Sequence, residues 1–178
     1  MDEQEAIRQL KHGDIGGLEF LVNLHQGKAV RTAYLITRDP ALAEDVVQEA
    51  FLQAYRSIRH FDPTRPFGPW FMRSVVHAAV KAARGNSPDP QGETLEELFA
   101  DEASVEELVE TAEFQERLRA ALGNLPPRQR AVIVQRYFLD MGEAEMAAGL
   151  ETAPGTIKWL LHEARRRLHS LLSERNSR

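Results

Sequence analysis

Apolar residues recur every three or four positions through most of the chain, which is the spacing of amphipathic helices. The clearest helix is predicted to begin at Asp39-Pro40, because an N-cap acceptor there precedes a proline at the first helical position. No segment shows a sustained alternation of apolar and polar residues with β-branched enrichment, so the sequence predicts an all-α fold. The apolar face of this first helix is made of Leu42, Val46, Val47, Ala50, Phe51, Ala54 and Ile58.

Two segments rich in proline and glycine interrupt the helical pattern. Residues 60–70, HFDPTRPFGPW, predict a loop that precedes a second helix at about Trp70 to Arg84. Residues 85–103, GNSPDPQGETLEELFADEA, contain acids but no base, which is the composition of a flexible linker. We therefore expect two small helical domains, residues 1–84 and 104–178, joined by an acidic linker at 85–103.

The second domain has the spacing of a helix-turn-helix. Its pattern predicts a helix from Pro126-Pro127 onwards, then a short helix at about 143–150, a turn of about four residues and a longer helix at about 154–172. This arrangement predicts a DNA-binding domain.

The last helix carries polar and aromatic residues on or near the side opposite its leucines. A tryptophan in that position, Trp159, must lie exposed or contact a partner, which favours a binding face. The alternative is an amphipathic helix whose polar face is merely solvated.

Charge is distributed unevenly along the chain, whose formal net charge is −5. Residues 1–84 carry +1, residues 85–112 carry −9 and residues 113–178 carry +3. Because the acidity belongs to the middle segment, the net charge is no argument against DNA binding by a local face elsewhere.

Composition excludes several classes of protein. Without cysteine there is no disulfide, zinc–thiolate cluster or cysteine nucleophile, which fits a reducing compartment. No apolar run approaches the roughly 18 to 20 residues of a membrane helix, and the polar start is unlike a signal peptide, so we expect a cytoplasmic protein without membrane insertion. The six histidines lack metal-ligand spacing, and no paired carboxylates converge. A small all-α hydrolase therefore has little support, and we predict no enzymatic activity, small-molecule substrate, cofactor or metal.

Residues 125–168, LPPRQRAVIVQRYFLDMGEAEMAAGLETAPGTIKWLLHEARRRL, resemble the C-terminal conserved region of bacterial sigma factors of the extracytoplasmic-function group. The N-terminal half is independently similar to the same family at Gly13-Asp14, in DPALAEDVVQEAFLQAY from Asp39 to Tyr55, and from Phe61 to Trp70. The resemblance implies two helical domains on a flexible tether. It also implies a protein that binds core RNA polymerase, directs it to promoters and helps to open promoter DNA.

The resemblance implies several partners beyond promoter DNA. The polar face of the helix from Asp39 would bind the clamp helices of the largest polymerase subunit, and the protein would also contact the flap of the second subunit. An anti-sigma factor would hide the polymerase-binding faces, and the acidic linker would thread toward the positively charged interior of the polymerase. The residues implied in polymerase binding are Asp45, Gln48, Glu49 and Leu52.

The proline-rich loop resembles the family's loop that captures a flipped base of the minus-ten element. Phe61 and Phe67 would supply apolar walls for an unstacked base, and Arg65 would supply hydrogen-bond donors. The alternative is a helix connector whose phenylalanines are core; Trp70 is expected in the core in either case. The residues expected at the minus-ten element are Phe61, Asp62, Arg65, Phe67, Arg73, His77 and Lys81.

The last two helices would read the minus-thirty-five element in the major groove. By position along the last helix, five residues are expected nearest to base edges and two arginines nearest to phosphates. The five are Thr156, Lys158, Trp159, His162 and Glu163, and the two are Arg165 and Arg166.

Some positions depart from the family pattern. Glu151 stands where a glycine commonly ends the first helix of the motif, which costs stability if the site requires a positive φ. Leu160 and Glu163 stand where arginines are common, and His77 and Lys81 replace a common asparagine and aspartate. Because glutamate can accept a hydrogen bond from cytosine N4, we hypothesise that Glu163 selects a cytosine.

A helix-turn-helix regulator that acts without being a polymerase subunit is the main alternative function. It would account for residues 113–178, but it leaves the AEDVVQEAF helix and the proline-rich loop without a role. It predicts promoter binding by the free protein, often as a dimer.

Overall fold

The structure, a computed structural model, describes residues 1–85 and 112–174. The chain divides into two compact units, Met1–Ala82 and Ala83–Arg178, and the described residues form helices and connecting turns without strands. The predicted all-α fold of two helical domains is confirmed. The predicted linker at 85–103 lies outside the described residues, except for Gly85 at the end of a helix.

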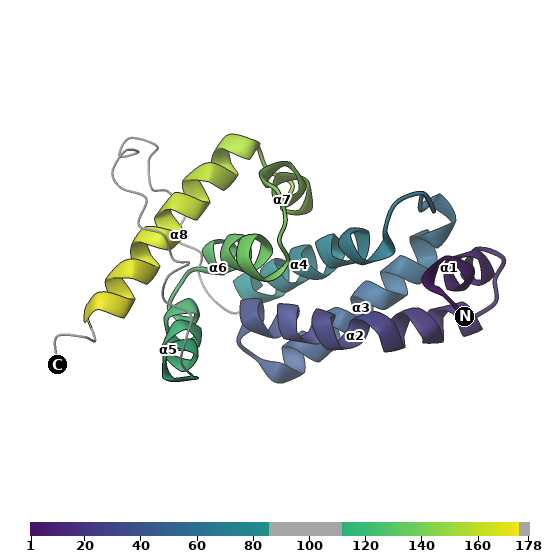
Figure 1. Cartoon of the computed structure of the whole chain (residues 1–178), viewed down its shortest axis with the longest axis horizontal. Coiled ribbons are helices and arrows are strands. Elements are labelled where there is room, and N and C mark those ends of the chain that lie inside the picture. Colours follow the sequence, from purple (N-terminus) through teal and green to yellow (C-terminus); the bar gives the residue numbers. More distant parts are fainter. Residues whose placement is uncertain (86–111, 175–178) are drawn as a thin grey trace. The chain divides into compact units, whose positions relative to one another are not determined.

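The first unit is built from four helices, coloured purple to teal in Figure 1. Helix α2 packs against both α1 and α3, and a short 3₁₀ turn, Ile58–His60, follows α3. The helices are α1 (Glu3–Lys11), α2 (Gly16–Thr37), α3 (Pro40–Ser57) and α4 (Phe67–Gly85).

Local sequence signals set the start of α3 as expected. Asp39 is extended, and its carboxylate accepts a hydrogen bond from the Leu42 backbone N–H at 3.1 Å, while Pro40 occupies the first turn. Helix α4 begins at Phe67, earlier than the predicted start at Trp70. The proline-rich loop is correspondingly shorter than expected.

A cluster of aromatic rings lies in the core of the first unit and links α3 to α4. Phe51 stacks on Phe71 with ring centroids 4.3 Å apart, and Phe71 lies 5.6 Å from Phe67. Phe61 meets the edge of Phe67 at 5.8 Å. Because Phe61 and Phe67 stand at the two ends of the loop at 62–66, this cluster anchors the loop at both ends.

The second unit gathers its helices around the long C-terminal helix, which packs against the three other α-helices described after residue 112. A π-helical turn, Val134–Phe138, continues the second of them. None of the helices described in residues 1–85 and 112–174 has the length and apolar character required to cross a membrane. The helices are α5 (Ala112–Gly123), α6 (Pro127–Ile133), α7 (Glu143–Gly149) and α8 (Pro154–Glu174).

The turn between α7 and α8 completes the predicted helix-turn-helix. Glu151 adopts a left-handed conformation with φ of 51°. The N–H groups of Glu151 and Thr152 donate to the carbonyls of Ala148 and Ala147 at 3.4 and 3.0 Å. These two bonds form a Schellman motif, in which the left-handed site is usually glycine. The site therefore requires a positive φ, the case in which we expect Glu151 to cost stability.

Candidate functional site

One face of α3 combines acidic, amide and apolar side chains in solvent. Leu52 is 47% exposed, although it follows directly after the buried Phe51. Asp45, Gln48 and Glu49 are also exposed and precede Leu52 at helical spacing. We call these four residues the α3 face; an apolar side chain beside carboxylates resembles the composition of a protein interface.

The phenylalanines of the proline-rich loop belong to the core. Phe61 and Phe67 are only 4% and 1% exposed, because they pack against each other and against Trp70. This corrects the expectation that they form the walls of an open base pocket, and it agrees with the alternative of a connector with core aromatics. Trp70, expected in the core, is only half-buried, with its ring 4.7 Å from Phe61 and 5.4 Å from Phe67.

The exposed part of the loop is polar and internally organised. Asp62 Oδ1 accepts hydrogen bonds from the Thr64 hydroxyl at 2.7 Å and from the Thr64 backbone N–H at 3.0 Å. These bonds, the hydroxyl foremost, lower the pKa of Asp62 below its ordinary value of 3.8. Arg65 Nε lies 3.8 Å from Asp62 Oδ2. The loop therefore presents a carboxylate, a hydroxyl and a guanidinium together.

A basic stripe runs along α4 after the loop. Arg73, His77 and Lys81 follow one another at intervals of four residues and so share one face of the helix. His77 and Lys81 are exposed, whereas Arg73 is half-buried and its Nε has no hydrogen-bond partner among the described residues. The helix thus carries these three basic residues on one face.

The first two turns of α8 present three side chains of different character. Lys158 is exposed, with its Nζ 3.9 Å from Glu143 Oε2, and Trp159 and His162 are half-buried. Thr156 is also half-buried, whereas Ile157 and Leu160 belong to the core. The departure at Leu160 therefore has a packing role.

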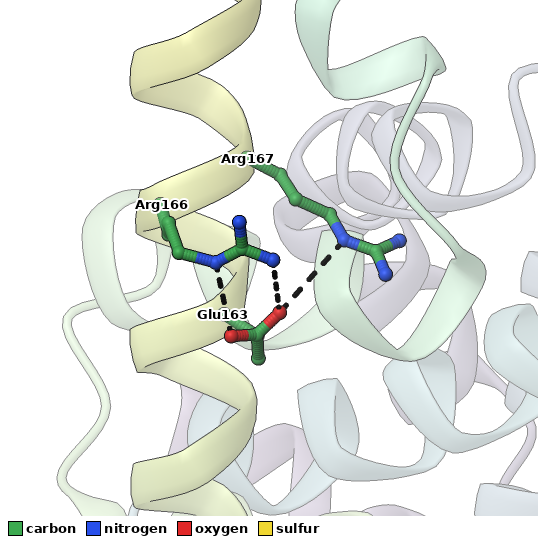
Figure 2. Close-up of polar contacts among 3 residues, drawn as sticks. All are labelled: Glu163, Arg166 and Arg167. Carbon is green, nitrogen blue, oxygen red and sulfur yellow. Dashed lines mark hydrogen bonds and ion pairs between the residues drawn. The ribbon is translucent and has the colours of Figure 1, made fainter. Parts of the chain in front are cut away.

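Glu163 is not on the exposed side of α8, where the periodicity placed it. Its carboxylate is buried and accepts two hydrogen bonds from Arg166, from Nε at 3.1 Å and from Nη2 at 2.9 Å (Figure 2). Arg167 Nε lies 3.9 Å from the same carboxylate. Both oxygens are thus engaged by arginine, so the structure gives no support to the hypothesis that Glu163 accepts from a cytosine.

The two arginines assigned to phosphates have separate anchors. Arg166 is paired with Glu163, and Arg165 donates its Nε hydrogen to the Tyr137 hydroxyl at 2.8 Å. Tyr137 is exposed and lies in the π-helical turn after α6. The structure therefore brings Arg165 and Arg166 to the same turn of α8, each fixed by a different side chain.

Comparison with known proteins identifies both units. Residues 21–88 match the family model of sigma-70 region 2, and residues 115–168 match that of sigma-70 region 4. The sigma factor SigM of Mycobacterium tuberculosis is 32% identical over 167 residues, which cover 93% of this chain and 82% of that protein. The chain belongs to the extracytoplasmic-function group of RNA polymerase sigma factors.

Other relatives of this sigma factor span almost its full length. SigW of Bacillus subtilis, also an extracytoplasmic-function sigma factor, is 28% identical over 181 residues, covering 96% of this chain and 97% of the relative. Directing RNA polymerase to promoters in transcription initiation is therefore the function of this sigma factor. The family consists of DNA-binding initiation factors, which are not enzymes.

Two solved structures share the fold of this sigma factor. CnrH in complex with the cytosolic domain of CnrY gives a TM-score of 0.66 at 24% identity and covers 97% of both chains. Sigma factor RpoE in complex with the anti-sigma factor NepR from Bartonella quintana gives 0.61 at 22% identity, covering 87% of this chain and 96% of that one.

Three side chains at these surfaces escaped the sequence prediction. Tyr55 is 39% exposed and follows Leu52 by three residues, so its helical spacing was a usable signal. The Thr64 backbone N–H donates to the carboxylate of Asp62, two residues earlier, and an Asp-Pro-Thr stretch is typical of such a turn. Tyr137 meets Arg165 only through tertiary packing, so the sequence of this sigma factor holds no local signal for it.

Proposed function

We propose that this sigma factor acts in the cytoplasm, where separate surfaces bind core RNA polymerase and promoter DNA. The α3 face binds the clamp helices of the largest subunit of core RNA polymerase, and the second unit contacts the flap of the second subunit. The exposed loop at 62–66 and the basic stripe of α4 engage the minus-ten element. The first turns of α8 enter the major groove of the minus-thirty-five element.

The exposure of Leu52 is the observation that carries the polymerase-binding proposal. Leu52 is 47% exposed, and three polar neighbours on α3, Asp45, Gln48 and Glu49, form a rim around it. Tyr55 adds an exposed aromatic side chain about one turn further along the helix. An apolar centre with a charged rim is the composition expected of a site that is covered when core polymerase binds.

The minus-ten proposal assigns recognition to the polar groups of the loop and not to its buried phenylalanines. Asp62, Thr64 and Arg65 are exposed and can form hydrogen bonds with a base that leaves the stack. Phe61 and Phe67 hold the two ends of the loop in the core. His77 and Lys81 are exposed on α4, and this exposure supports a role in following the phosphates of the same DNA strand.

The minus-thirty-five proposal assigns base contacts to Thr156, Lys158, Trp159 and His162. A helix-turn-helix places the N-terminal residues of its second helix against base edges, and these residues occupy the first turns of α8. Arg165 and Arg166 lie further along the helix, where contacts to phosphates are expected.

An anti-sigma factor is proposed as a further partner. Two solved relatives of the same fold are bound, by their descriptions, to the cytosolic domain of CnrY and to an anti-sigma factor. A partner of this kind would cover the α3 face and so compete with core polymerase.

A pair of leucine variants tests the α3 face. Leu52→Arg should weaken binding of the full-length chain to core polymerase about tenfold or more, because it places a charge at the centre of the interface. Leu24→Arg is the matched control, since Leu24 on α2 is also exposed, at 54%. Binding is measured by fluorescence titration, and promoter-specific activity by run-off transcription on genomic promoters. Equal binding by both variants, or no promoter-specific transcript from the wild-type protein, would contradict the proposal.

A further inference from the structure

Glu163 and Arg166 form a pair in which a buried carboxylate holds an exposed guanidinium. The side chain of Glu163 is 11% exposed and that of Arg166 is 61% exposed. Two parallel hydrogen bonds join them, from Nε and Nη2 to the two carboxylate oxygens, one turn apart on α8. Such a bidentate pair fixes the plane of the guanidinium as well as its position.

The carboxylate of Glu163 is in its charged form at neutral pH. The hydrogen bonds from Arg166 lower the pKa of Glu163 below its ordinary value of 4.5, and the nearby charges of Arg166 and Arg167 act in the same direction. An arginine guanidinium keeps its positive charge in proteins, so Arg166 can attract a phosphate while Glu163 holds its plane.

The place of Arg166 on α8 suits a phosphate better than a base. Arg166 lies twelve residues after Pro154, which begins the helix, and so about 18 Å along its axis. Base edges are met by the N-terminal residues of a recognition helix, whereas the following turns run out of the groove past the backbone. The pair with Glu163 engages two of the five N–H donors of the guanidinium, on the edge that faces the carboxylate.

We propose that Glu163 is a positioning residue that fixes the guanidinium of Arg166 for contact with one phosphate of the minus-thirty-five element. The proposal rests on the proposed role of α8 in binding that element. Because the pair with Glu163 already restricts the side chain of Arg166, Arg166 loses less conformational entropy when it binds the phosphate. It therefore contributes to promoter affinity without contacting DNA and without selecting a base.

The test is a phosphate scan with the holoenzyme assembled from core polymerase and the full-length chain. Promoter duplexes each carry one methylphosphonate, which removes the charge of one phosphate in or beside the minus-thirty-five element. For the wild-type protein, neutralising one particular phosphate should weaken binding about tenfold. With Arg166→Ala the same phosphate should have no effect. With Glu163→Gln it should lose most of its effect, while preferences across a panel of base substitutions stay unchanged.

Two further variants separate positioning from folding and from charge. Arg166→Lys keeps the positive charge at an exposed position but cannot form the bidentate pair, so it should behave like Glu163→Gln. Glu116→Gln removes a carboxylate from the exposed pair with Arg119 at 3.4 Å on α5, and its scan should match that of the wild-type protein. Purely structural damage would weaken binding to all duplexes alike and would leave the phosphate profile unchanged.

The outcomes distinguish this inference from the proposed function. If Glu163→Gln retained the full effect of the Arg166-dependent phosphate, or if no phosphate depended on Arg166, the positioning role would be wrong. A change in base preference with Glu163→Gln would instead restore a base-reading role. If the scan of the wild-type holoenzyme and its base panel showed no contact with the minus-thirty-five element, the proposed function of α8 would fail as well.

Discussion

Arg165 donates its Nε hydrogen to the Tyr137 hydroxyl at 2.8 Å, and its guanidinium carbon lies 5.7 Å from the centre of the same ring. The contact joins α8 to the π-helical turn that precedes the helix-turn-helix. The contact therefore anchors the Arg165 side chain on the exposed ring of Tyr137, at a π-helical turn, a type of turn that often marks functional positions.

Tyr137→Phe removes the acceptor but keeps the ring. We expect the free energy of unfolding to fall by about 0.5 to 1 kcal/mol, because the lost hydrogen bond is charged but exposed to solvent. Urea denaturation measures the change, and Arg165→Ala provides the background for a double-mutant cycle. If Tyr137→Phe cost the same in the presence and absence of the Arg165 side chain, the contact would contribute nothing to stability.

The half-buried indole of Trp159 predicts a contact with a thymine methyl group. An apolar side chain on a recognition helix distinguishes thymine through its C5-methyl, which uracil lacks. Replacing one thymine of the minus-thirty-five element by deoxyuridine should weaken binding of the wild-type holoenzyme about fivefold and leave binding of Trp159→Ala unchanged. His162→Ala, one turn away, should retain the response to uracil. Equal affinity of the wild-type holoenzyme for every uracil-substituted duplex would exclude the methyl contact.

The hydrogen bonds from Thr64 lower the pKa of Asp62. The Thr64 hydroxyl is the foremost cause of the lowered pKa of Asp62, so Thr64→Val should raise this pKa toward 3.8. Because the pKa of Asp62 is lower in the folded protein than in the unfolded chain, ionised Asp62 stabilises the fold at pH values above its ordinary pKa. This stabilisation is lost as the pH falls through the lower pKa of the folded state. Carboxyl NMR titration measures the pKa directly. The same pKa in both proteins would show that the hydroxyl does not act on Asp62.

Two glycines of α2 should respond in opposite directions to alanine. A Cβ on Gly17 would lie 2.2 Å from the Ala6 carbonyl oxygen, so Gly17→Ala must separate α1 from α2 and should cost about 3 kcal/mol. A Cβ on Gly27 meets nothing within 4 Å, so Gly27→Ala should stabilise the helix by about 0.5 to 1 kcal/mol. Thermal and urea unfolding compare the two variants. A stable Gly17→Ala protein would contradict the close approach of α1 and α2.

Replacing Glu151 by glycine should stabilise the second unit. The φ of 51° at Glu151 is unfavourable for a residue with a side chain, so Glu151→Gly should raise the free energy of unfolding by about 1 kcal/mol. Glu151→Ala keeps the strain and should change stability by less than about 0.5 kcal/mol. If Glu151→Ala stabilised the protein as much as Glu151→Gly, the gain would come from removal of the carboxylate and not from relief of backbone strain.

Local signals explain what the sequence predicted correctly. The start of α3 follows from Asp39 and Pro40 alone, and the helix-turn-helix follows from the spacing of its helices and the turn between them. The exposed α3 face also follows from periodicity, because the opposite face is apolar throughout.

Tertiary packing explains what the sequence did not reveal. Glu163 was expected outside the core because it flanks the leucine stripe, but α5, α6 and α7 all pack on α8 and cover more than that stripe. Phe61 and Phe67 fit a base pocket and a core equally well by composition, and only their mutual contact decides between the two. The start of α2 carries a weak signal, since Ile15 before the helix offers no side-chain cap.

Helix α8 serves at once as the proposed reader of the promoter and as the central support of its own domain. Its buried positions are fixed by packing, so they cannot vary freely when the target sequence changes. Promoter preference in this lineage can therefore evolve at low cost only through the few side chains of α8 that face solvent. A drift in specificity should leave the core unchanged and should be confined to a small set of substitutions, which makes this helix a compact target for redesigning promoter choice.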